Sequence, residues 1–312
     1  MAISLLQSLR DTPLAFVDVE TTGASVAYGH RIIELGIARV EGGVITRTYS
    51  QLIDPLMRVG PGITALTGIS QQMVEGQPTF AAQLPAAMEL LRGAVVIGHN
   101  VRFDLSFLNR EFRRARVDLS AELGPTQVFD TVRIARRMYG RGGNGLQRLA
   151  LRLGVTPTAA HRALADAVTT VGVFDRMLAP CGGWALPIVD VMQRQGGAMG
   201  LLPANSSESL LPLELEEALD HKLPVIMEYL DAEDRRTERV IRPVRLRKMN
   251  QELMLVAHCE LRQAQRTFKV ERIVQMKRIE DAAPTATPTP CPPSPSLTIV
   301  TPSPLQQPML FE

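Results

Sequence analysis

The sequence is poor in the residues that would mark several common classes of protein. It has three cysteines, one tryptophan and 4% aromatic residues among its 312 residues. The cysteines, Cys181, Cys259 and Cys291, are odd in number and far apart, so they support neither a disulfide framework nor a zinc knuckle and indicate a reducing, cytoplasmic compartment. No run of 18 apolar residues is present, so no membrane span or membrane partner is expected. Residues 1–10 lack a basic stretch followed by an apolar core, so no signal peptide is expected.

A large excess of charge of either sign is also missing from the chain as a whole. The 34 Lys+Arg residues nearly balance the 32 Asp+Glu residues, and the net charge of +2 excludes a histone-like polycation. The charge is nevertheless distributed unevenly. Residues 235–278 contain 13 Lys+Arg against four Asp+Glu, a local balance of +9, so the near-neutral total does not argue against a nucleic-acid partner.

What the sequence does contain is a long α/β pattern over residues 1–180. Short runs rich in β-branched residues predict strands, and longer segments with helical spacing predict helices. The expected strands are Leu14–Glu20, Arg31–Val40, Val44–Leu52 and Ala94–Ile97, and the expected helices are Leu105–Ala115, Thr131–Tyr139, Leu146–Leu153 and Arg162–Leu178. Residues 181–210 are rich in Gly, Pro and Ser and are interpreted as an interdomain linker.

Residues 211–281 form a second, smaller unit. It begins with an expected helix at 213–221 and continues with strand-like runs such as Val225–Tyr229 and Leu253–Ala257. The size of this segment and its density of strands predict a small β-rich domain.

Two acidic residues, Asp18 and Glu20, end the first apolar strand. Residues i and i+2 of a strand point to one face, so these two carboxylates are expected to lie side by side. They repel each other unless a cation neutralises them, which favours a hard divalent metal ion as their partner. The alternative is a solvated strand end followed by an ordinary turn.

Further acids stand near the beginning of expected helices. Asp104 follows the strand-ending segment Gly98–Asn100, and Asp166 follows His161 by five residues. Each acid has an alternative role as a first-turn residue favoured by the helix macrodipole, and His161 as a loop histidine. Asp130 is interpreted as the N-cap of the helix that follows it rather than as a metal ligand.

In combination, these segments resemble the DEDDh family of 3′–5′ exonucleases, in particular the proofreading exonucleases of bacterial DNA polymerase III. The resemblance covers residues 12–178. The matching motifs are Phe16–Gly23, Ile63–Ile69, Gly98–Asn100 with Phe103 and Asp104, Phe129–Thr131, and His161–Leu164 with Asp166. The offset from His161 to Asp166 fits the histidine branch, since Arg162 stands where the other branch would place tyrosine.

The resemblance implies a ribonuclease H-like α/β fold, a mixed sheet flanked by helices, with a two-metal active site. Asp18, Glu20, Asp104 and Asp166 match the four acidic metal ligands, and His161 matches the histidine that names the branch. The implied cofactors are two Mg²⁺ or Mn²⁺ ions, which suit carboxylate ligands and activate water for phosphodiester hydrolysis. His161, with an ordinary pKa of ~6.5, can accept the proton of that water.

The resemblance also implies contacts to the substrate. Thr21 and nearby backbone match contacts to the terminal nucleotide, and Leu66 or Phe103 matches a residue that packs against its base or sugar. The alternative for Leu66 and Phe103 is plain core packing.

The second unit resembles the WYL domain, a small β-barrel-like module of bacterial regulators and nucleic-acid enzymes. The resemblance depends on the segments 237–243, 258–262 and 266–273. The tripeptide that names the domain is replaced by Leu253-Met254-Leu255, which keeps a hydrophobic strand but removes aromatic stacking surfaces. Arginine forks pair well with the phosphates of single-stranded nucleic acid, and the candidates are Arg242, Arg245, Arg262, Arg266 and Arg272. The alternatives are a solvated basic face and a general arginine bias of the genome.

A proline-rich tail ends the chain. Residues 282–305 carry no charge and are expected to be a disordered linker that buries no core. At 306–312, the residues Gln307, Leu310 and Phe311 resemble the short peptide that docks into the bacterial sliding clamp. The alternative is a frayed terminus with incidental apolar residues.

Together these features predict a metal-dependent exonuclease that acts at the 3′ ends of DNA, with single-stranded ends favoured, in replication or repair. One alternative is an enzyme with the same chemistry that acts on RNA, an exoribonuclease of the RNase T or oligoribonuclease kind. An alternative of another class is a nucleic-acid-binding regulator whose exonuclease fold is inactive. The intact set of five candidate catalytic residues argues against that regulator.

Overall fold

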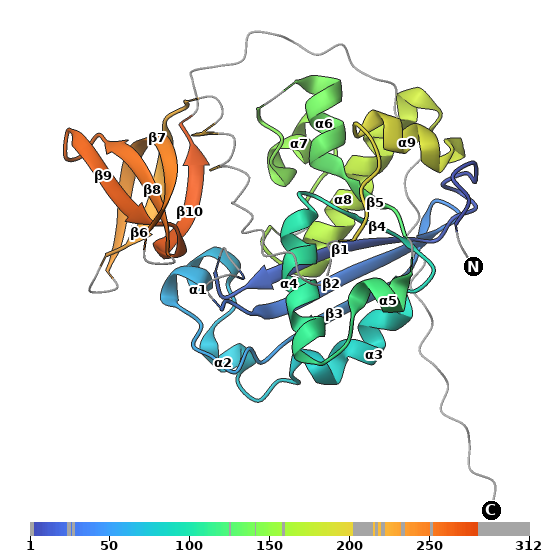
Figure 1. Cartoon of the computed structure of the whole chain (residues 1–312). Coiled ribbons are helices and arrows are strands. Elements are labelled where there is room, and N and C mark those ends of the chain that lie inside the picture. The colour runs from blue at the N-terminus through green and yellow to red at the C-terminus, as the bar shows by residue number, and fades with distance from the viewer. Residues whose placement is uncertain are drawn as a thin grey trace, which may run out of the picture.

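The first part of the chain is built around a five-stranded mixed β-sheet (Figure 1). The computed structural model describes residues 3–23, 26, 29–124, 126–140, 142–157, 160–201, 215, 218, 219, 222–231, 235–249 and 252–279. The strands are β1 Leu14–Thr21, β2 Ile32–Glu41, β3 Val44–Leu52, β4 Val95–Gly98 and β5 Val128–Asp130, in the order β3-β2-β1-β4-β5. β1 pairs antiparallel with β2 and parallel with β4. β1 is therefore the central strand.

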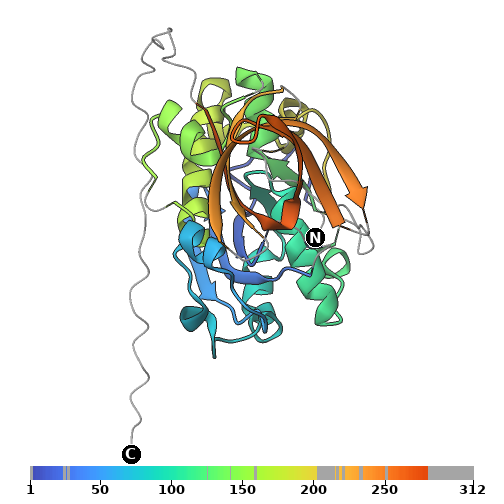
Figure 2. The ribbon, with the colours of Figure 1, turned by 90° about the vertical axis from the view of Figure 1, so that its left-hand side faces the viewer.

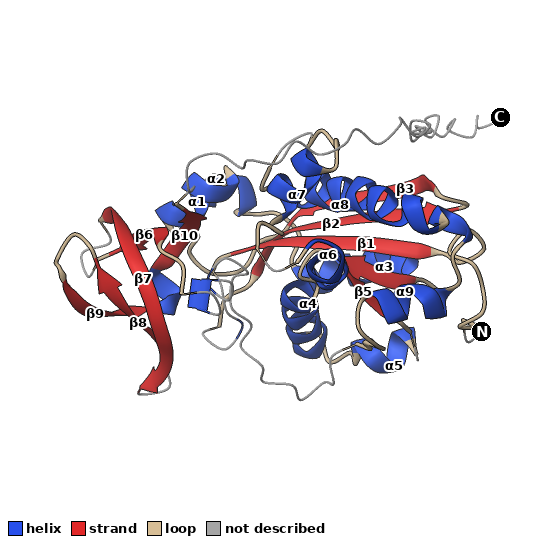
Figure 3. Cartoon of the chain, turned by 90° about the horizontal axis from the view of Figure 1, so that it is seen from above, coloured by secondary structure: helices blue, strands red, loops and turns tan. Residues whose placement is uncertain are grey.

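Helices cover both faces of this sheet (Figure 3). They are α1 Pro61–Thr67, α2 Gln71–Val74, α3 Phe80–Leu91, α4 Arg102–Arg114, α5 Leu119–Leu123, α6 Thr131–Tyr139, α7 Leu146–Arg152, α8 Ala163–Leu178 and α9 Ile188–Arg194. Residues of α3 and α4 share one core with the sheet, and residues of α6, α7 and α8 share a second core on the opposite face. The mixed sheet between two layers of helices confirms the predicted α/β class.

The alternation of side chains along β1 assigns each residue to one of the two cores. Ala15, Val17 and Val19 belong to the core that contains α3 and α4. Phe16 belongs to the core that contains α8. Because residues two apart share a face, Asp18 and Glu20 continue the row of Phe16 toward α8.

The strands and helices expected in the first unit are present, with some differences at their ends. The helix predicted at Thr131–Tyr139 has the predicted bounds, and Asp130 caps it by accepting a hydrogen bond from the backbone N–H of Val132 at 2.9 Å. Strand β5 was not predicted because its three residues are too few to show a period. Helices α1, α2, α3 and α5 were not among the expected elements either.

Part of the segment expected as a linker, 181–210, is folded. The described residues 181–201 contain the 3₁₀ helix η3 Gly183–Ala185 and helix α9, and Leu186, Ile188 and Val191 are buried with the core around α8. Glycine and proline here shape short turns between packed elements rather than an open connection. Residues 202–210 lie outside the described residues.

The second unit is a five-stranded antiparallel sheet. Its strands are β6 Val225–Leu230, β7 Arg236–Met249, β8 Glu252–Cys259, β9 Ala264–Lys269 and β10 Ile273–Arg278, in the order β10-β6-β7-β8-β9. Leu255, the last residue of the altered tripeptide, is fully buried in the core of this sheet. Strand β10 lies next to α1, and Figure 2 shows this sheet in front of the first unit.

The structure does not describe the C-terminal tail. The proline-rich residues 282–305 and the terminal residues Gln307, Leu310 and Phe311 lie outside the described residues. Within the described part of the chain, no helix combines the length and the apolar character that crossing a membrane requires.

Candidate active site

The candidate site forms where β1 ends beside α4 and α8. Asp104, in the first turn of α4, is 3% exposed and accepts a hydrogen bond from the backbone N–H of Val19 at 3.0 Å. Val19 lies between Asp18 and Glu20 in the sequence. The hydrogen bond therefore fixes α4 to the part of β1 that carries the two acids.

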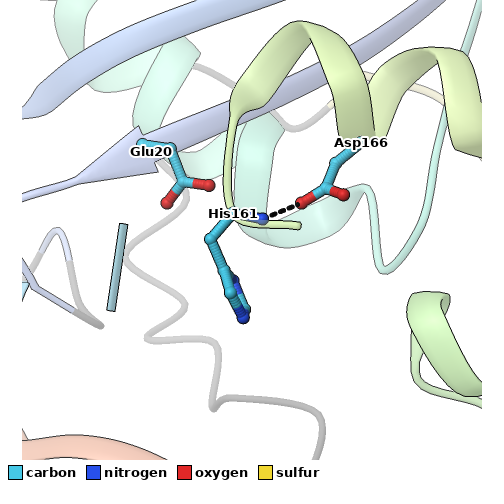
Figure 4. A group of neighbouring side chains, drawn as sticks. All are labelled: Glu20, His161 and Asp166. Atoms are coloured by element: carbon cyan, nitrogen blue, oxygen red, sulfur yellow. Dashed lines mark hydrogen bonds between the residues drawn. The ribbon is translucent and has the colours of Figure 1, made fainter. Parts of the chain in front are cut away.

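The turn before α8 brings His161 and Asp166 to the same place. The backbone N–H of His161 donates to Oδ2 of Asp166 at 3.0 Å, and Nε2 of Gln147 donates to Oδ1 at 2.7 Å. His161 has a φ of 59°, a left-handed conformation that the surrounding contacts must hold. Figure 4 shows the carboxylates of Glu20 and Asp166 on the two sides of this turn.

Three of the predicted residues are grouped closely enough to share a cation. Glu20, His161 and Asp166 each offer a ligand atom, and these atoms lie within 4.8 Å of one another. Asp18 and Asp104 are not part of this group of three, but the charge of Asp104 acts on Glu20, and the charges of Glu20 and Asp166 act on Asp18. The repulsion of Asp104 is the largest charge effect on Asp18, ahead of that of Glu20.

Burial and repulsion by neighbouring carboxylates raise the pKa of all four acids. Burial is the largest cause for Asp18, Glu20 and Asp104, and it raises the pKa of each well above the ordinary value. Burial also raises the pKa of Asp166 to about 6. Carboxylates in this state are destabilised as anions, and a divalent cation between them would remove that cost. The oxygen-rich donor set thus fits Mg²⁺ or Mn²⁺ better than a soft metal.

Two residues beside the acids were not singled out from the sequence. Glu34 of β2 lies opposite Glu20 in the strand register and is 1% exposed. Its carboxylate accepts hydrogen bonds from the guanidinium of Arg162, the residue between His161 and α8. In the sequence, Glu34 could have been singled out because it is the one acid within the apolar run Ile32–Ile37, and a buried acid requires a partner.

The predicted substrate contacts differ in their surroundings. The hydroxyl of Thr21 donates to the backbone O of Gly23 at 2.8 Å, so it shapes the turn after β1. Phe103 is partly buried and its ring lies 5.0 Å from that of Phe107. Leu66 of α1 is partly exposed. Phe103 therefore already takes part in core packing, whereas Leu66 remains accessible to a ligand.

The candidate arginines of the second sheet are not equivalent. Nη1 of Arg272 donates to the backbone O of Asp231, which ties the arginine to its own unit. Arg242 pairs with Glu260 at 2.8 Å. Arg245, Arg262 and Arg266 are exposed. These last three retain the accessibility that binding a phosphate requires.

Comparison with known proteins identifies two matching segments. Residues 15–174 match the Exonuclease family (RNase_T), and residues 212–278 match the WYL domain. The chain is 37% identical over 163 residues to the 3′-5′ exonuclease DinG of Bacillus subtilis (strain 168), which is 52% of this chain and 17% of DinG. It is 32% identical over 178 residues to DNA polymerase III subunit epsilon of Aquifex aeolicus (strain VF5), which is 57% of this chain and 86% of that subunit.

Solved structures share the fold at low sequence identity. The nuclease domain of 3′hExo, a DEDDh family member bound to rAMP, has a TM-score of 0.50 and 16% identity, and the match covers 58% of this chain and 98% of that domain. Exonuclease I has a TM-score of 0.51 and 15% identity, over 86% of this chain and 64% of its own. These similarities concern the arrangement of helices and strands.

Proposed function

The chain belongs to the Exonuclease (RNase_T) family, and from this premise we propose that it is a metal-dependent 3′–5′ exonuclease. The observation that carries the proposal is the convergence of four acids and a histidine at the end of β1. Glu20, His161 and Asp166 have ligand atoms within 4.8 Å of one another, and the effect of the charges of Asp104, Glu20 and Asp166 on Asp18 supports including Asp18 and Asp104 in the site. A decayed site would not be expected to keep all five groups.

The proposed roles follow from the position and charge of each group. Asp18, Glu20, Asp104 and Asp166 would hold two Mg²⁺ or Mn²⁺ ions. When bound, such ions polarise a phosphodiester and lower the pKa of water. His161 would accept the proton of the attacking water, and its partial exposure suits a base that exchanges protons with solvent. Gln147 and the backbone of His161 would keep Asp166 oriented toward the ions.

The proposed substrate is DNA with a single-stranded or frayed 3′ end. Similarity to a DNA polymerase III subunit and to the 3′-5′ exonuclease DinG supports DNA over RNA and supports a role in replication or repair. Leu66 and Phe103 would pack against the terminal nucleotide, while Thr21 would position the backbone that contacts it. The exoribonuclease alternative predicts the same chemistry with RNA as the preferred strand.

The second sheet and the tail would supply additional contacts. Strand β10 lies next to α1, the helix that carries Leu66, which supports a role of this sheet close to the path of the substrate. Arg245, Arg262 and Arg266 would bind phosphates, with smaller contributions from the paired Arg242 and Arg272. Gln307, Leu310 and Phe311 would bind a bacterial sliding clamp, with the proline-rich segment as a tether that raises the effective concentration.

The test of the proposed function is direct. Purified protein is incubated with 3′-labelled single-stranded DNA, duplex DNA and RNA of matched sequence, in Mg²⁺, Mn²⁺ or EDTA. Asp18→Asn should abolish cleavage with the fold intact by circular dichroism. Glu89→Gln, which alters an exposed acid of α3, should leave the rate unchanged. Absence of cleavage on all three substrates would refute the enzyme and leave the binding regulator, and cleavage of RNA alone would favour the exoribonuclease.

A further inference from the structure

A fifth carboxylate lies beside the four proposed ligands. Glu34 is paired in register with Glu20 across β1 and β2, and its charge raises the pKa of Asp18, Glu20 and Asp166. Its side chain is 1% exposed. A buried carboxylate next to other carboxylates is unfavourable unless hydrogen bonds and a counter-charge compensate it. Its partners therefore indicate what it does.

Both oxygens of Glu34 are occupied by the turn that begins α8. Oε1 accepts from Nη2 of Arg162 at 2.8 Å, and Oε2 accepts from the backbone N–H of Ala163 at 3.0 Å. Nε of Arg162 lies 3.2 Å from Oε1 and 3.1 Å from Oε2. By contrast, among the described residues no group donates a hydrogen bond to the carboxylate of Glu20. Both oxygens of Glu34 are thus bonded to the turn that begins α8, whereas Glu20 keeps its oxygens available for a cation.

The backbone of the same turn is pressed against β2. A Cβ atom at Gly36 would lie 2.3 Å from the carbonyl C of Ala163 and 2.3 Å from the N of Leu164. Gly36 and Glu34 lie on the same face of β2, since they are two residues apart. The start of α8 is therefore attached to β2 at two points along one row, by close backbone contact and by the ion pair.

We propose that Glu34 and Arg162 are positioning residues that hold the turn 161–163 so that His161 and Asp166 face Glu20. This inference rests on the proposed nuclease function. Arg162 is the immediate neighbour of His161, whose backbone has a φ of 59°, a left-handed conformation that is uncommon for residues other than glycine. A bidentate guanidinium–carboxylate pair restricts rotation as well as distance, which a single contact does not.

The exposure of the pair separates positioning from a purely structural role. The side chain of Arg162 is 44% exposed and can be solvated without its partner, whereas Glu34 is 1% exposed, so Arg162→Gln leaves a buried charge uncompensated but Glu34→Gln and the double variant do not. Loss of a contact that supports a catalytic group typically lowers activity by about 10- to 100-fold. Activity therefore responds to small displacements of such a group that hardly change the free energy of unfolding. A large loss of rate with little loss of stability in Glu34→Gln and in the double variant is therefore the signature of the proposed role.

The experiment compares Glu34→Gln, Arg162→Gln, the double variant and Arg162→Lys with wild type. Each single variant should lower kcat by about 10- to 100-fold with little change in KM, and the double variant should be no worse than the poorer single variant because the two act as a unit. Arg162→Lys keeps the positive charge but cannot form the bidentate guanidinium–carboxylate pair, so it should not restore kcat fully. Arg47→Gln, which breaks the exposed pair with Glu89, is the matched control and should keep the wild-type rate.

Two measurements need no turnover. Calorimetric titration with Mn²⁺ should still show binding by Glu34→Gln, since Glu34 is not a ligand. In ¹³C-histidine NMR, one of the five histidine signals, assigned with His161→Gln, should be broadened by Mn²⁺ in wild type and less so in Arg162→Gln. Loss of Mn²⁺ binding in Glu34→Gln would overturn the proposal in favour of a fifth ligand. Unchanged kcat and unchanged broadening in Arg162→Gln would also overturn it. An inactive wild type would refute the proposed function, while the broadening would still decide the role of the pair.

Discussion

Removing metal ions should make the stability of this protein fall as the pH rises, with Asp166 as a measurable contributor. The pKa of Asp166 is about 6 in the folded chain, above the ordinary value of 3.8, because burial disfavours its charged form. A carboxyl group whose pKa is raised on folding stabilises the fold fully below the unfolded value. That stabilisation is lost as the pH passes through about 6.

The size of the effect follows from the same two values. At about 1.36 kcal/mol per pKa unit, the difference between 3.8 and about 6 corresponds to a loss of about 3 kcal/mol once Asp166 is fully ionised. Roughly half of this loss, about 1 to 2 kcal/mol, falls between pH 5 and pH 8. Ionisation of the neighbouring Glu20 acts in the same direction, because its pKa is raised by burial and by the charge of Asp166.

Asp166→Asn is the matched perturbation, because it removes the charge and nearly preserves the shape. Urea unfolding in EDTA at several pH values between 5 and 8 should show wild type losing stability relative to this variant, by about 1 to 2 kcal/mol over the interval. Adding Mn²⁺ at pH 8 should stabilise wild type, by about 2.7 kcal/mol at a concentration 100 times the Kd, and should stabilise the variant less. If the free energies of unfolding of wild type and Asp166→Asn changed in parallel with pH in EDTA, the reasoning would be refuted.

Three further predictions concern His161, the contact of β2 with α8, and the tail. His161→Gln should lower kcat by about 10²- to 10⁴-fold while Mn²⁺ binding by calorimetry persists, and an unchanged rate would exclude a role as base. Gly36→Ala should destabilise the fold by about 3 kcal/mol in urea unfolding, because its Cβ would meet backbone that cannot move cheaply. Gly60→Ala, where no atom lies within 4 Å of the added Cβ, is its control, and equal stability of the two variants would contradict the argument. Deleting 306–312 should abolish pull-down of a bacterial sliding clamp without changing cleavage of a short oligonucleotide, and retained pull-down would rule out this segment as the docking peptide.

The pattern of the sequence was most informative where one short segment determines its own structure. The strand that ends in Asp18 and Glu20 was predicted because apolar residues followed by two acids with period two specify a buried strand and the common face of the acids. The helix at Thr131–Tyr139 was predicted because its period and its cap, Asp130, are both local. Where glycine and proline suggested a linker, at 181–201, the burial of Ile188 and Val191 against distant helices decided otherwise.

The sequence by itself determined the chemistry of the candidate site, since residue types and their spacing within β1, before α4 and before α8 are local properties. Only the tertiary structure decided how these pieces meet. The approach of Glu34 to Arg162 spans 128 positions of the chain, and the close packing of Gly36 on Ala163 depends on the docking of α8 against β2. Neither contact has a period or a motif, because each results from the packing of whole elements. Local periodicity specifies the elements, whereas the orientation of catalytic groups depends on contacts between residues far apart in the chain.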